Sequence, residues 1–394
     1  MRIAVVVHGR FHAFDLAREL LRRSHEVTVF TNHPAWSAER FGIPRQHVMS
    51  CWLEGGLDRL TGVAARRGLG NYPESFLHQW FGRWAARHLA ARPWDVAYCL
   101  SGSAEEPLRA LGGTPCLRHV VRGSSHIRVQ ATILEAERRR TGLAYEGPSS
   151  WIIAREEREY ALADRIVVLS RFAHDTFVAE GISPEKLLIL PLGAQLNLFR
   201  PTEETIDARC RRIAAGAPLT ILYVGALTLR KGLRDLAEFA TQLDRRDFRI
   251  RLIGPISREV QPLLRDVKLF AELIPPQPQQ TLPQWYAAGD IFVFPTLEDG
   301  FANTLAQAHA SALPILCTTN CGGPDIIREG DTGWILPIRR PDAFLARLRW
   351  CHEHRRELVT MVRRSYTIDK SRDWSDMAQD FETACLARLG VPNP

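Results

Sequence analysis

Apolar residues occur in short, uninterrupted runs along the first half of the chain, and each run ends at a turn or a polar loop. The first run occupies residues 3–7, and a loop at 8–12, an amphipathic stretch at 13–22 and a second run at 26–31 follow it. Runs without alternation are typical of strands buried on both faces, and this strand–loop–helix–strand order predicts a doubly wound parallel sheet. We expect further strands of this sheet at 95–100, 115–121, 165–169 and 187–190.

The same pattern starts again in the second half. Strands are predicted at 219–224, 248–253, 291–294 and 333–336, with one more apolar strand after Pro314. A chain of 394 residues is also longer than one typical core, which favours two domains. We therefore predict an α/β protein with an N-terminal domain at 1–197, a second domain at 198–375, and a C-terminal helix within 376–394 that packs back toward the first domain.

The stretch 294–324 is the strongest candidate for a ligand site. A buried strand ends at Pro295, Gly300 allows a sharp turn and a close approach of the backbone, and a helix is expected to follow. The free N–H groups and the positive dipole end of that helix favour an anion, most often phosphate. Asp299 can accept hydrogen bonds from sugar hydroxyls, and Gln307 lies about two helical turns further on. The alternative is an ordinary βαβ unit with a glycine turn.

Two loops of the first domain also follow predicted strands. Loops at the carboxyl ends of parallel strands line the ligand crevice, so the loops at 8–12 and 122–126 should reach a cleft. The second combines a cation, a glycine turn, two hydroxyls and an imidazole. A histidine in such a loop can equally form a hydrogen bond with the backbone. The candidate residues of the two loops are Gly9, Arg10, His12, Arg122, Ser124 and His126.

The composition is that of an ordinary globular protein, with 45% hydrophobic and 24% charged residues, but the formal charge of +7 is unevenly distributed. Residues 1–200 hold 26 Lys and Arg against 20 Asp and Glu. This basic excess favours an anionic membrane surface or an acidic acceptor, with a solvated arginine-rich surface as the alternative. We expect no nucleic-acid partner.

The cysteines and the N-terminus bear on localisation. The chain has 8 cysteines and no Cys-x-x-Cys pair, which favours reduced thiols in a cytoplasmic protein. The first apolar run is too short for a signal peptide, and no stretch approaches the ~18 apolar residues of a membrane span. We expect a cytoplasmic protein whose membrane association, if any, is peripheral and on the cytoplasmic face.

A lysine follows the first strand of the second domain. The loop 225–232 contains Arg230 and Lys231 and is not a P-loop, since its glycine follows the lysine. The chain has only four lysines, at positions 186, 231, 268 and 370, so a lysine here suggests that a compact point charge is required. Chance is the alternative explanation, because four lysines must fall somewhere.

The second half resembles the retaining nucleotide-sugar glycosyltransferases of family four, which have the GT-B fold. Their Val-Gly-x-Leu-x4-Lys-Gly signature corresponds to residues 224–232. Their Pro-Ser-x-x-Glu-Gly-Phe motif and the second Glu that follows it correspond to 295–301 and Gln307, and a Gly-Gly pair stands at 322–323. The match extends back to residues 163–170 and 190–199, covers about 220 residues, and is specific when its motifs are taken together.

The resemblance implies two Rossmann-like doubly wound domains that face a central cleft. A nucleotide-sugar donor would bind the second domain, and a glycan or lipid-linked acceptor would bind mainly the first. It implies that Lys231 and Arg230 neutralise the donor diphosphate and that Asp299, the third catalytic candidate, holds the sugar. The resemblance implies donor-binding residues Gly225, Arg230, Lys231, Gly254, Asp299, Gly300, Phe301, Ala302, Asn303, Thr304 and Gln307.

Three departures from the family pattern affect these assignments. Asp299 replaces the usual Glu and has a shorter reach, Gln307 replaces the second Glu, and Ala226 stands where an Arg is frequent. No Asp-x-Asp pair or histidine cluster suggests a metal, and no cofactor is expected because the nucleotide-sugar is a substrate. Two alternatives stay open: an isomerase similar to the sugar-nucleotide 2-epimerases, and a protein that binds nucleotide-sugar without chemistry.

Overall fold

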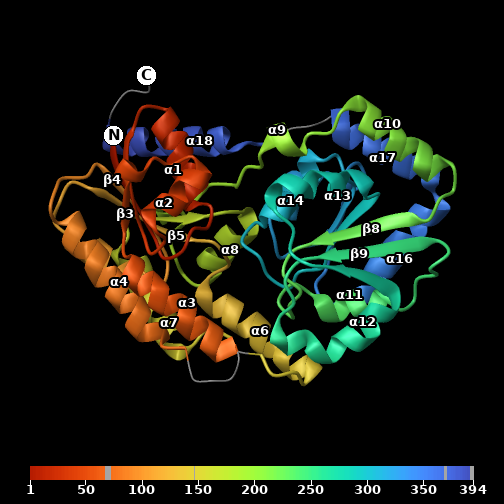
Figure 1. The fold of residues 1–394 in the computed structure, drawn as a ribbon, viewed down its shortest axis with the longest axis horizontal. Helices are drawn as coiled ribbons and strands as arrows, with labels where there is room; N and C mark the ends of the chain where they lie inside the picture. The colour runs from red at the N-terminus through yellow and green to blue at the C-terminus, as the bar shows by residue number, and fades with distance from the viewer. Residues whose placement is uncertain (67–71, 146, 368–370, 391–394) are drawn as a thin grey trace.

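The structure, a computed structural model, describes residues 1–66, 72–145, 147–367 and 371–390. It contains two parallel sheets, each covered by helices, which lie side by side along the longest axis of the molecule (Figure 1). The expectation of two Rossmann-like doubly wound domains is confirmed. Because every ladder in both sheets is parallel, the helices between the strands must cross over the sheet faces.

The first sheet has the strand order β3-β2-β1-β4-β5-β6-β7. Its order reverses between β1 and β4, and the carboxyl ends of these two strands flank the crevice where such sheets bind ligands. The short β3 was not predicted from the sequence, since its three residues are only half-buried. The strands are β1 (Arg2–Val7), β2 (Glu26–Thr31), β3 (Val48–Ser50), β4 (Val96–Leu100), β5 (Leu117–Arg122), β6 (Arg165–Val168) and β7 (Leu187–Ile189).

The continuous apolar run of β1 reflects burial on both faces of the sheet. Ile3, Val5 and Val7 pack into one hydrophobic cluster, whereas Ala4 and Val6 pack into another. Successive side chains of a strand point to opposite faces, so a strand covered on both sides needs apolar residues at every position.

The second sheet has the order β10-β9-β8-β11-β12-β13, and its order reverses between β8 and β11. The strand β10 was not predicted, because it carries a glutamate and is half-buried at the edge of the sheet. The strands are β8 (Leu219–Val224), β9 (Phe248–Ile253), β10 (Ala271–Ile274), β11 (Ile291–Phe294), β12 (Ile315–Thr318) and β13 (Gly333–Leu336).

Helices connect the strands and cover both sheets. Those of the first half are α1 (Ala13–Arg22), α2 (Ala35–Ala38), α3 (Trp52–Arg66), α4 (Glu74–Leu89), α5 (Glu105–Ala110), α6 (Ile127–Thr141), α7 (Ser150–Leu162), α8 (Arg171–Ala179) and α9 (Leu196–Phe199). Those of the second are α10 (Glu203–Ala214), α11 (Leu233–Ala240), α12 (Leu264–Phe270), α13 (Leu282–Ala288), α14 (Asn303–Ala310), α15 (Gly323–Ile326), α16 (Pro341–Glu353), α17 (Arg355–Thr367) and α18 (Trp374–Leu389).

The last helix, α18, crosses back to the first domain. It begins at Trp374, where Asp373 and Asp376 form a reciprocal capping box, two residues before the start that the sequence suggested. In Figure 1 it lies beside α1, at the opposite end of the chain. Glu382 forms an ion pair with Arg23 at 2.6 Å, and the ring of Phe381 packs against Tyr98 of β4 with centroids 5.2 Å apart.

Candidate active site

A cavity of about 660 Å³ lies between the two sheets. The first domain lines it with residues that follow β1 and β5, and the second with residues that follow β8 and β11. All four loops leave the carboxyl ends of parallel strands, which is where open α/β sheets bind ligands. The structure therefore brings the two halves of the predicted site together around one space.

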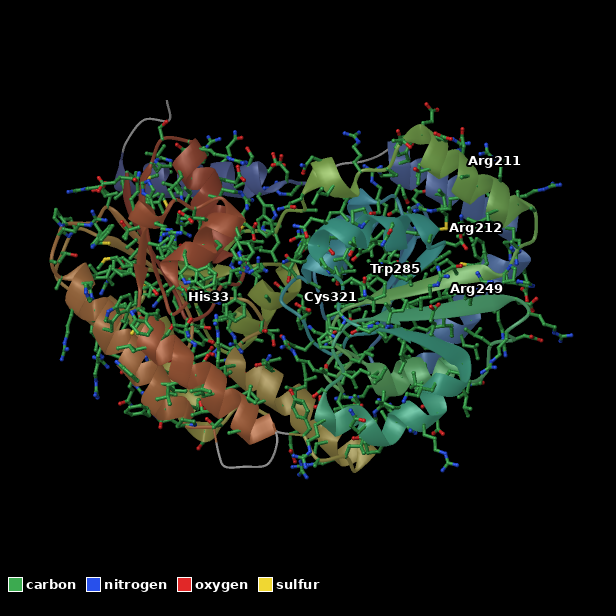
Figure 2. All side chains as sticks on the ribbon, viewed as in Figure 1. His33, Arg211, Arg212, Arg249, Trp285 and Cys321 are labelled. Carbon is green, nitrogen blue, oxygen red and sulfur yellow. The ribbon has the colours of Figure 1, made fainter. Side chains whose placement is uncertain are left out.

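Lys231 and Asp299 form an ion pair within this cavity. Both side chains are largely buried, and Asp299 also accepts a hydrogen bond from the Phe301 N–H at 3.2 Å. The Asp299 N–H donates to the carbonyl oxygen of Asn320 at 2.9 Å, which fixes the loop from behind. Cys321, in the same supporting loop, is labelled in Figure 2 on the side of the second domain that faces the first.

Burial lowers the pKa of the Lys231 ammonium, although the charge of Asp299 opposes this change. The positive charge of Arg230 adds to the lowering. An ammonium beside another cation has a destabilised charged form, and it gains most from an additional anion. A diphosphate in the cavity would therefore be favoured by both cations.

Arg230 joins the second domain to the first. Its Nε–H donates to Glu298 at 2.8 Å, and one terminal nitrogen donates to the Ser124 hydroxyl at 2.7 Å. Glu298 was not predicted from the sequence as a site residue, because next to Asp299 it reads as one more acidic residue in a loop. In the structure its side chain has no exposed surface.

The helix α14 begins at Asn303, three residues after Gly300. Ala302 precedes it with φ 75° and ψ 108°, a left-handed backbone conformation that is unfavourable for a residue with a Cβ atom. Ala302 and Asn303 line the cavity. The start of α14 therefore lies at the cavity, where the sequence predicts an anion.

Gln307 lines the cavity one turn further along α14. Its side-chain oxygen accepts a hydrogen bond from the Tyr286 hydroxyl at 2.9 Å, and Tyr286 is fully buried. The side chain is thus held from inside the domain.

On the first domain, Arg10, His12, Arg122 and Ser124 line the cavity. Arg122 is held by Glu156 and by the side chain of Gln130, each at 2.7 Å. The His12 Nε2 and the Tyr98 hydroxyl are 3.0 Å apart, and burial lowers the pKa of His12 to about 4. His12 is therefore a neutral imidazole near neutral pH.

His126 does not line the cavity, which corrects the expectation that it faces an acceptor. It caps α6, where its Nδ1 accepts a hydrogen bond from the Arg128 N–H at 3.4 Å. Its buried ring packs against Tyr160 and Phe177, with centroids 5.2 Å and 4.9 Å apart. The histidine serves the backbone and the core, which was the alternative explanation from the sequence.

Several other predicted residues lie behind the cavity lining. The backbones of Gly225 and Gly254 lie in close contact, since a Cβ atom on Gly254 would lie 1.9 Å from the carbonyl oxygen of Gly225. The Gly9 N–H donates to the Asn32 side chain at 2.8 Å. None of the predicted residues Gly9, Gly225, Gly254, Gly300, Phe301 and Thr304 belongs to the cavity lining.

The cavity also contains residues that the sequence did not single out. Gln277, Gln279 and Leu282 extend it beyond β10, and Trp374 reaches it from the start of α18. A glutamine in a loop carries no recognisable pattern, so no sequence signal could have found the first two. Among the residues that the structure describes, no group of three His, Cys, Asp or Glu side chains is placed to hold a metal ion.

Comparisons with known proteins agree with this architecture. Residues 218–354 match the family described as glycosyl transferases group 1, and residues 10–193 match the glycosyl transferase 4-like domain. The first half of the chain is thus similar to glycosyl transferase 4-like domains, and the second half is similar to group 1 glycosyl transferases.

Two relatives illustrate the sequence similarity. The chain is 26% identical over 224 residues to the colanic acid biosynthesis glycosyltransferase WcaL of Salmonella typhimurium, a match that covers 53% of this chain and 50% of the relative. It is 28% identical over 195 residues to the D-inositol 3-phosphate glycosyltransferase of Nocardia farcinica, covering 46% and 43%. The matches thus span about half the length of these curated relatives.

Solved structures resemble the whole chain. The Anabaena protein Alr3699/HepE in complex with UDP aligns with a TM-score of 0.70 and 14% identity over 98% of this chain and 100% of its own. Sucrose-phosphate synthase of Thermosynechococcus elongatus aligns with a TM-score of 0.71 and 14% identity over 98% and 99%. The fold is therefore GT-B.

Proposed function

We propose that the protein transfers a sugar from a nucleotide-sugar donor to a glycan or lipid-linked acceptor, with retention of the anomeric configuration, in cell-surface polysaccharide biosynthesis. One observation carries the proposal: Lys231, Arg230 and Asp299 converge at a cavity that loops of the other domain also line. The UDP complex of Alr3699/HepE and the name of WcaL support the donor class and the pathway class.

The donor is proposed to bind with its diphosphate beside Lys231, Arg230 and the start of α14. Asp299 would accept hydrogen bonds from sugar hydroxyls, and Gln307 would contact the ribose. Asp299 and Lys231 form an ion pair in the free protein. When the donor binds, Lys231 would contact its diphosphate and Asp299 would contact its sugar. The acceptor would approach from Arg10, His12 and the loop after β5.

Negative charge grows on the diphosphate as the glycosidic bond breaks. Fixed cations and helix N–H groups then stabilise the transition state more than the ground state. An oxygen of the leaving diphosphate can take the acceptor proton on the same face of the sugar, which gives retention. This chemistry does not need the pair of flanking carboxylates that glycosidases use.

The test is a panel of UDP-, GDP- and ADP-sugars in a thermal-shift assay, followed by turnover with the donor that stabilises most. The anomeric configuration of the product, measured by NMR, decides between retention and inversion. We expect turnover only when an acceptor is added, and unchanged turnover in EDTA. Conversion of the donor without an acceptor would instead identify an isomerase, and binding without any turnover would identify a non-catalytic protein.

A peripheral contact with an anionic membrane is part of the proposal. The first domain exposes large apolar side chains on and near α3, including Trp52 at 61% and Leu60 at 71% exposure. Arg40 and Arg59 are exposed on the same domain. Apolar side chains beside cations suit the surface of an anionic bilayer. None of the helices formed by the described residues is long and apolar enough to cross a membrane.

Liposome sedimentation tests this contact. The protein should bind vesicles containing anionic lipid at low salt, and a Trp52→Asp, Leu60→Asp variant should bind them less. The exposed Leu269 of α12 in the second domain offers a matched control, since Leu269→Asp should not change sedimentation. Equal sedimentation with anionic and neutral vesicles would refute the contact.

A further inference from the structure

Glu298 is a carboxylate without exposed surface at the boundary between the two domains. It belongs to the second domain but accepts hydrogen bonds from two groups of the first. These donors are the Ser125 N–H at 2.7 Å and the Gln130 side chain at 2.9 Å. Its third donor is the Nε–H of Arg230 at 2.8 Å, from its own domain.

A buried carboxylate is costly unless charge and hydrogen bonds compensate for its lost hydration. Burial alone raises the pKa of Glu298, but the charge of Arg230, the hydrogen bond from Ser125, the charge of Lys231 and the bond from Gln130 outweigh it. The result is a pKa of about 2. Glu298 is therefore ionised throughout the physiological range, and its negative charge is directed at Arg230.

Arg230 is held at two points. Glu298 fixes its Nε–H, and the Ser124 hydroxyl accepts from a terminal nitrogen at 2.7 Å. Ser124 and Ser125 are neighbours in the loop after β5, so both contacts lead to the same loop of the first domain. A guanidinium fixed in this way loses little further freedom when it binds a phosphate oxygen.

We propose that Glu298 is a positioning residue that fixes Arg230 against the Ser124–Ser125 loop, so that the cation is already in place when the donor diphosphate binds. This inference rests on the proposed function, in which Arg230 stabilises the leaving diphosphate. Glu298 itself is shielded from the cavity, since it does not belong to the cavity lining. It acts through Arg230.

The first test is Glu298→Gln. Glutamine keeps the shape and still accepts from the Ser125 N–H, but it loses the charge that orients Arg230. We expect kcat to fall roughly 10- to 100-fold, less than the 10²–10³ typical of removing a charge stabiliser itself, because Arg230 is still present. The affinity for the nucleoside diphosphate alone, measured by calorimetry, should stay within about threefold, because loss of preorganisation affects the transition state more than the ground state.

The second test is a double-mutant cycle with Arg230→Gln. If Glu298 acts through Arg230, adding Glu298→Gln to Arg230→Gln should change kcat by less than about twofold. Independent effects that multiply would overturn the proposal, because Glu298 would then act only by joining the domains. A kcat for Glu298→Gln within threefold of the wild-type value would overturn it as well.

Asp290 offers a matched control in the same domain. It is 1% exposed and accepts hydrogen bonds from the Thr220 N–H at 2.7 Å and from Arg212 at 2.6 Å. Arg212 is labelled in Figure 2 on the outer side of the second domain, away from the first domain. Both Asp290→Asn and Glu298→Gln should lower the melting temperature, but Asp290→Asn should leave kcat within about twofold.

The Nε–H resonance of Arg230 in ¹⁵N NMR separates failure of this inference from failure of the proposed function. In the free protein it should be protected from exchange, and it should lose that protection in Glu298→Gln. If the wild-type protein transfers no sugar from any donor, the proposed function fails, yet the resonance still reports the contact. An Nε–H that exchanges equally fast in both proteins would overturn the positioning role.

Discussion

At the scale of single residues, Lys231 shows how the structure changes an assignment made from sequence. The sequence suggested a compact point charge for a ligand, and in the structure this side chain is only 17% exposed and already forms an ion pair with Asp299. Replacing it should therefore affect both rate and stability. A loss of one partner leaves the other charge partly buried and unpaired, which is destabilising.

We predict that Lys231→Ala lowers kcat by on the order of 10²–10³, the effect of removing one preorganised charge stabiliser. It should also lower the melting temperature, because Asp299 loses its partner. The exposed Lys268 of α12 provides a control, and Lys268→Ala should change neither quantity. If Lys231→Ala keeps more than a third of the wild-type kcat at saturating donor, Lys231 does not contact the diphosphate.

At Ala302 the backbone conformation determines the effect of a substitution. An L-residue at φ 75° loses on the order of 1 kcal/mol of stability through contact of its Cβ atom with the backbone. We predict that Ala302→Gly raises the free energy of unfolding by up to about 1 kcal/mol, since strain relief exceeds the entropy that glycine adds to the unfolded chain. Urea denaturation measures the change.

The same substitution inside α14 is the control for Ala302. Ala308 is fully buried in the helix interior, and Ala308→Gly should destabilise by about 1 kcal/mol or more. Opposite signs for the two variants are the expected result. A destabilising Ala302→Gly would show that the positive φ is not strained in this loop.

At the scale of elements, the loop before α14 packs directly against the loop before α6. A Cβ atom on Gly300 would lie 2.4 Å from the carbonyl oxygen of Gly123, across the boundary between the domains. The glycine that the sequence assigned to a phosphate turn therefore allows two backbones to meet. This close contact also brings Glu298 within reach of Ser125.

We predict that Gly300→Ala forces the two loops apart and lowers kcat at least tenfold, because a displacement of about 1 Å at positioned groups can cost ~100-fold in rate. The matched control is Gly147→Ala, since Gly147 lies outside the cavity lining and a Cβ atom on it meets nothing within 4 Å. It should retain wild-type kcat. Equal losses in both variants, measured by steady-state kinetics, would contradict the loop contact.

At the scale of the whole molecule, buried and partly buried histidines set the response to pH. The pKa of each of His12, His78, His119 and His126 is lowered to about 4, and burial is the main reason. Between pH 6.5 and 4 the unfolded chain binds protons at these positions that the folded chain does not. Stability must therefore fall as the pH falls through this range, by about 1 to 2 kcal/mol per histidine between pH 7 and 5.

Glu159 opposes this trend. Burial and the nearby Glu156 raise the pKa of Glu159 to about 8, so the folded state keeps a proton that the unfolded state loses above pH 4.5. Burial also raises the pKa values of Glu156, Asp235, Glu259 and Asp325. The large shifts of the four imidazoles outweigh these carboxyls. We predict a lower melting temperature at pH 5 than at pH 7.5, measured by scanning calorimetry. An unchanged or higher melting temperature at pH 5 would contradict the burial of these imidazoles.

Much of the architecture was predictable because its cause is local. The uninterrupted apolar runs of β1 and β8 mark strands covered on both faces, and their recurrence predicted two parallel sheets. The edge strands β3 and β10 escaped prediction because they are short and only half-buried. The loops that carry Lys231 and Asp299 were found from their positions at strand ends, a rule that depends only on chain order.

The sequence by itself determined which residues can carry the chemistry, since the type and spacing of Arg230, Lys231 and Asp299 are properties of the chain. Tertiary structure alone decided how these residues are held. Glu298 and Ser125 are 173 residues apart in sequence, and only the packing of two domains makes them partners. Packing within the first domain buried His126 against Tyr160 and Phe177, and packing between the domains made Gly300 a contact point. Neither could be predicted, because burial and pairing depend on neighbours that no local pattern specifies.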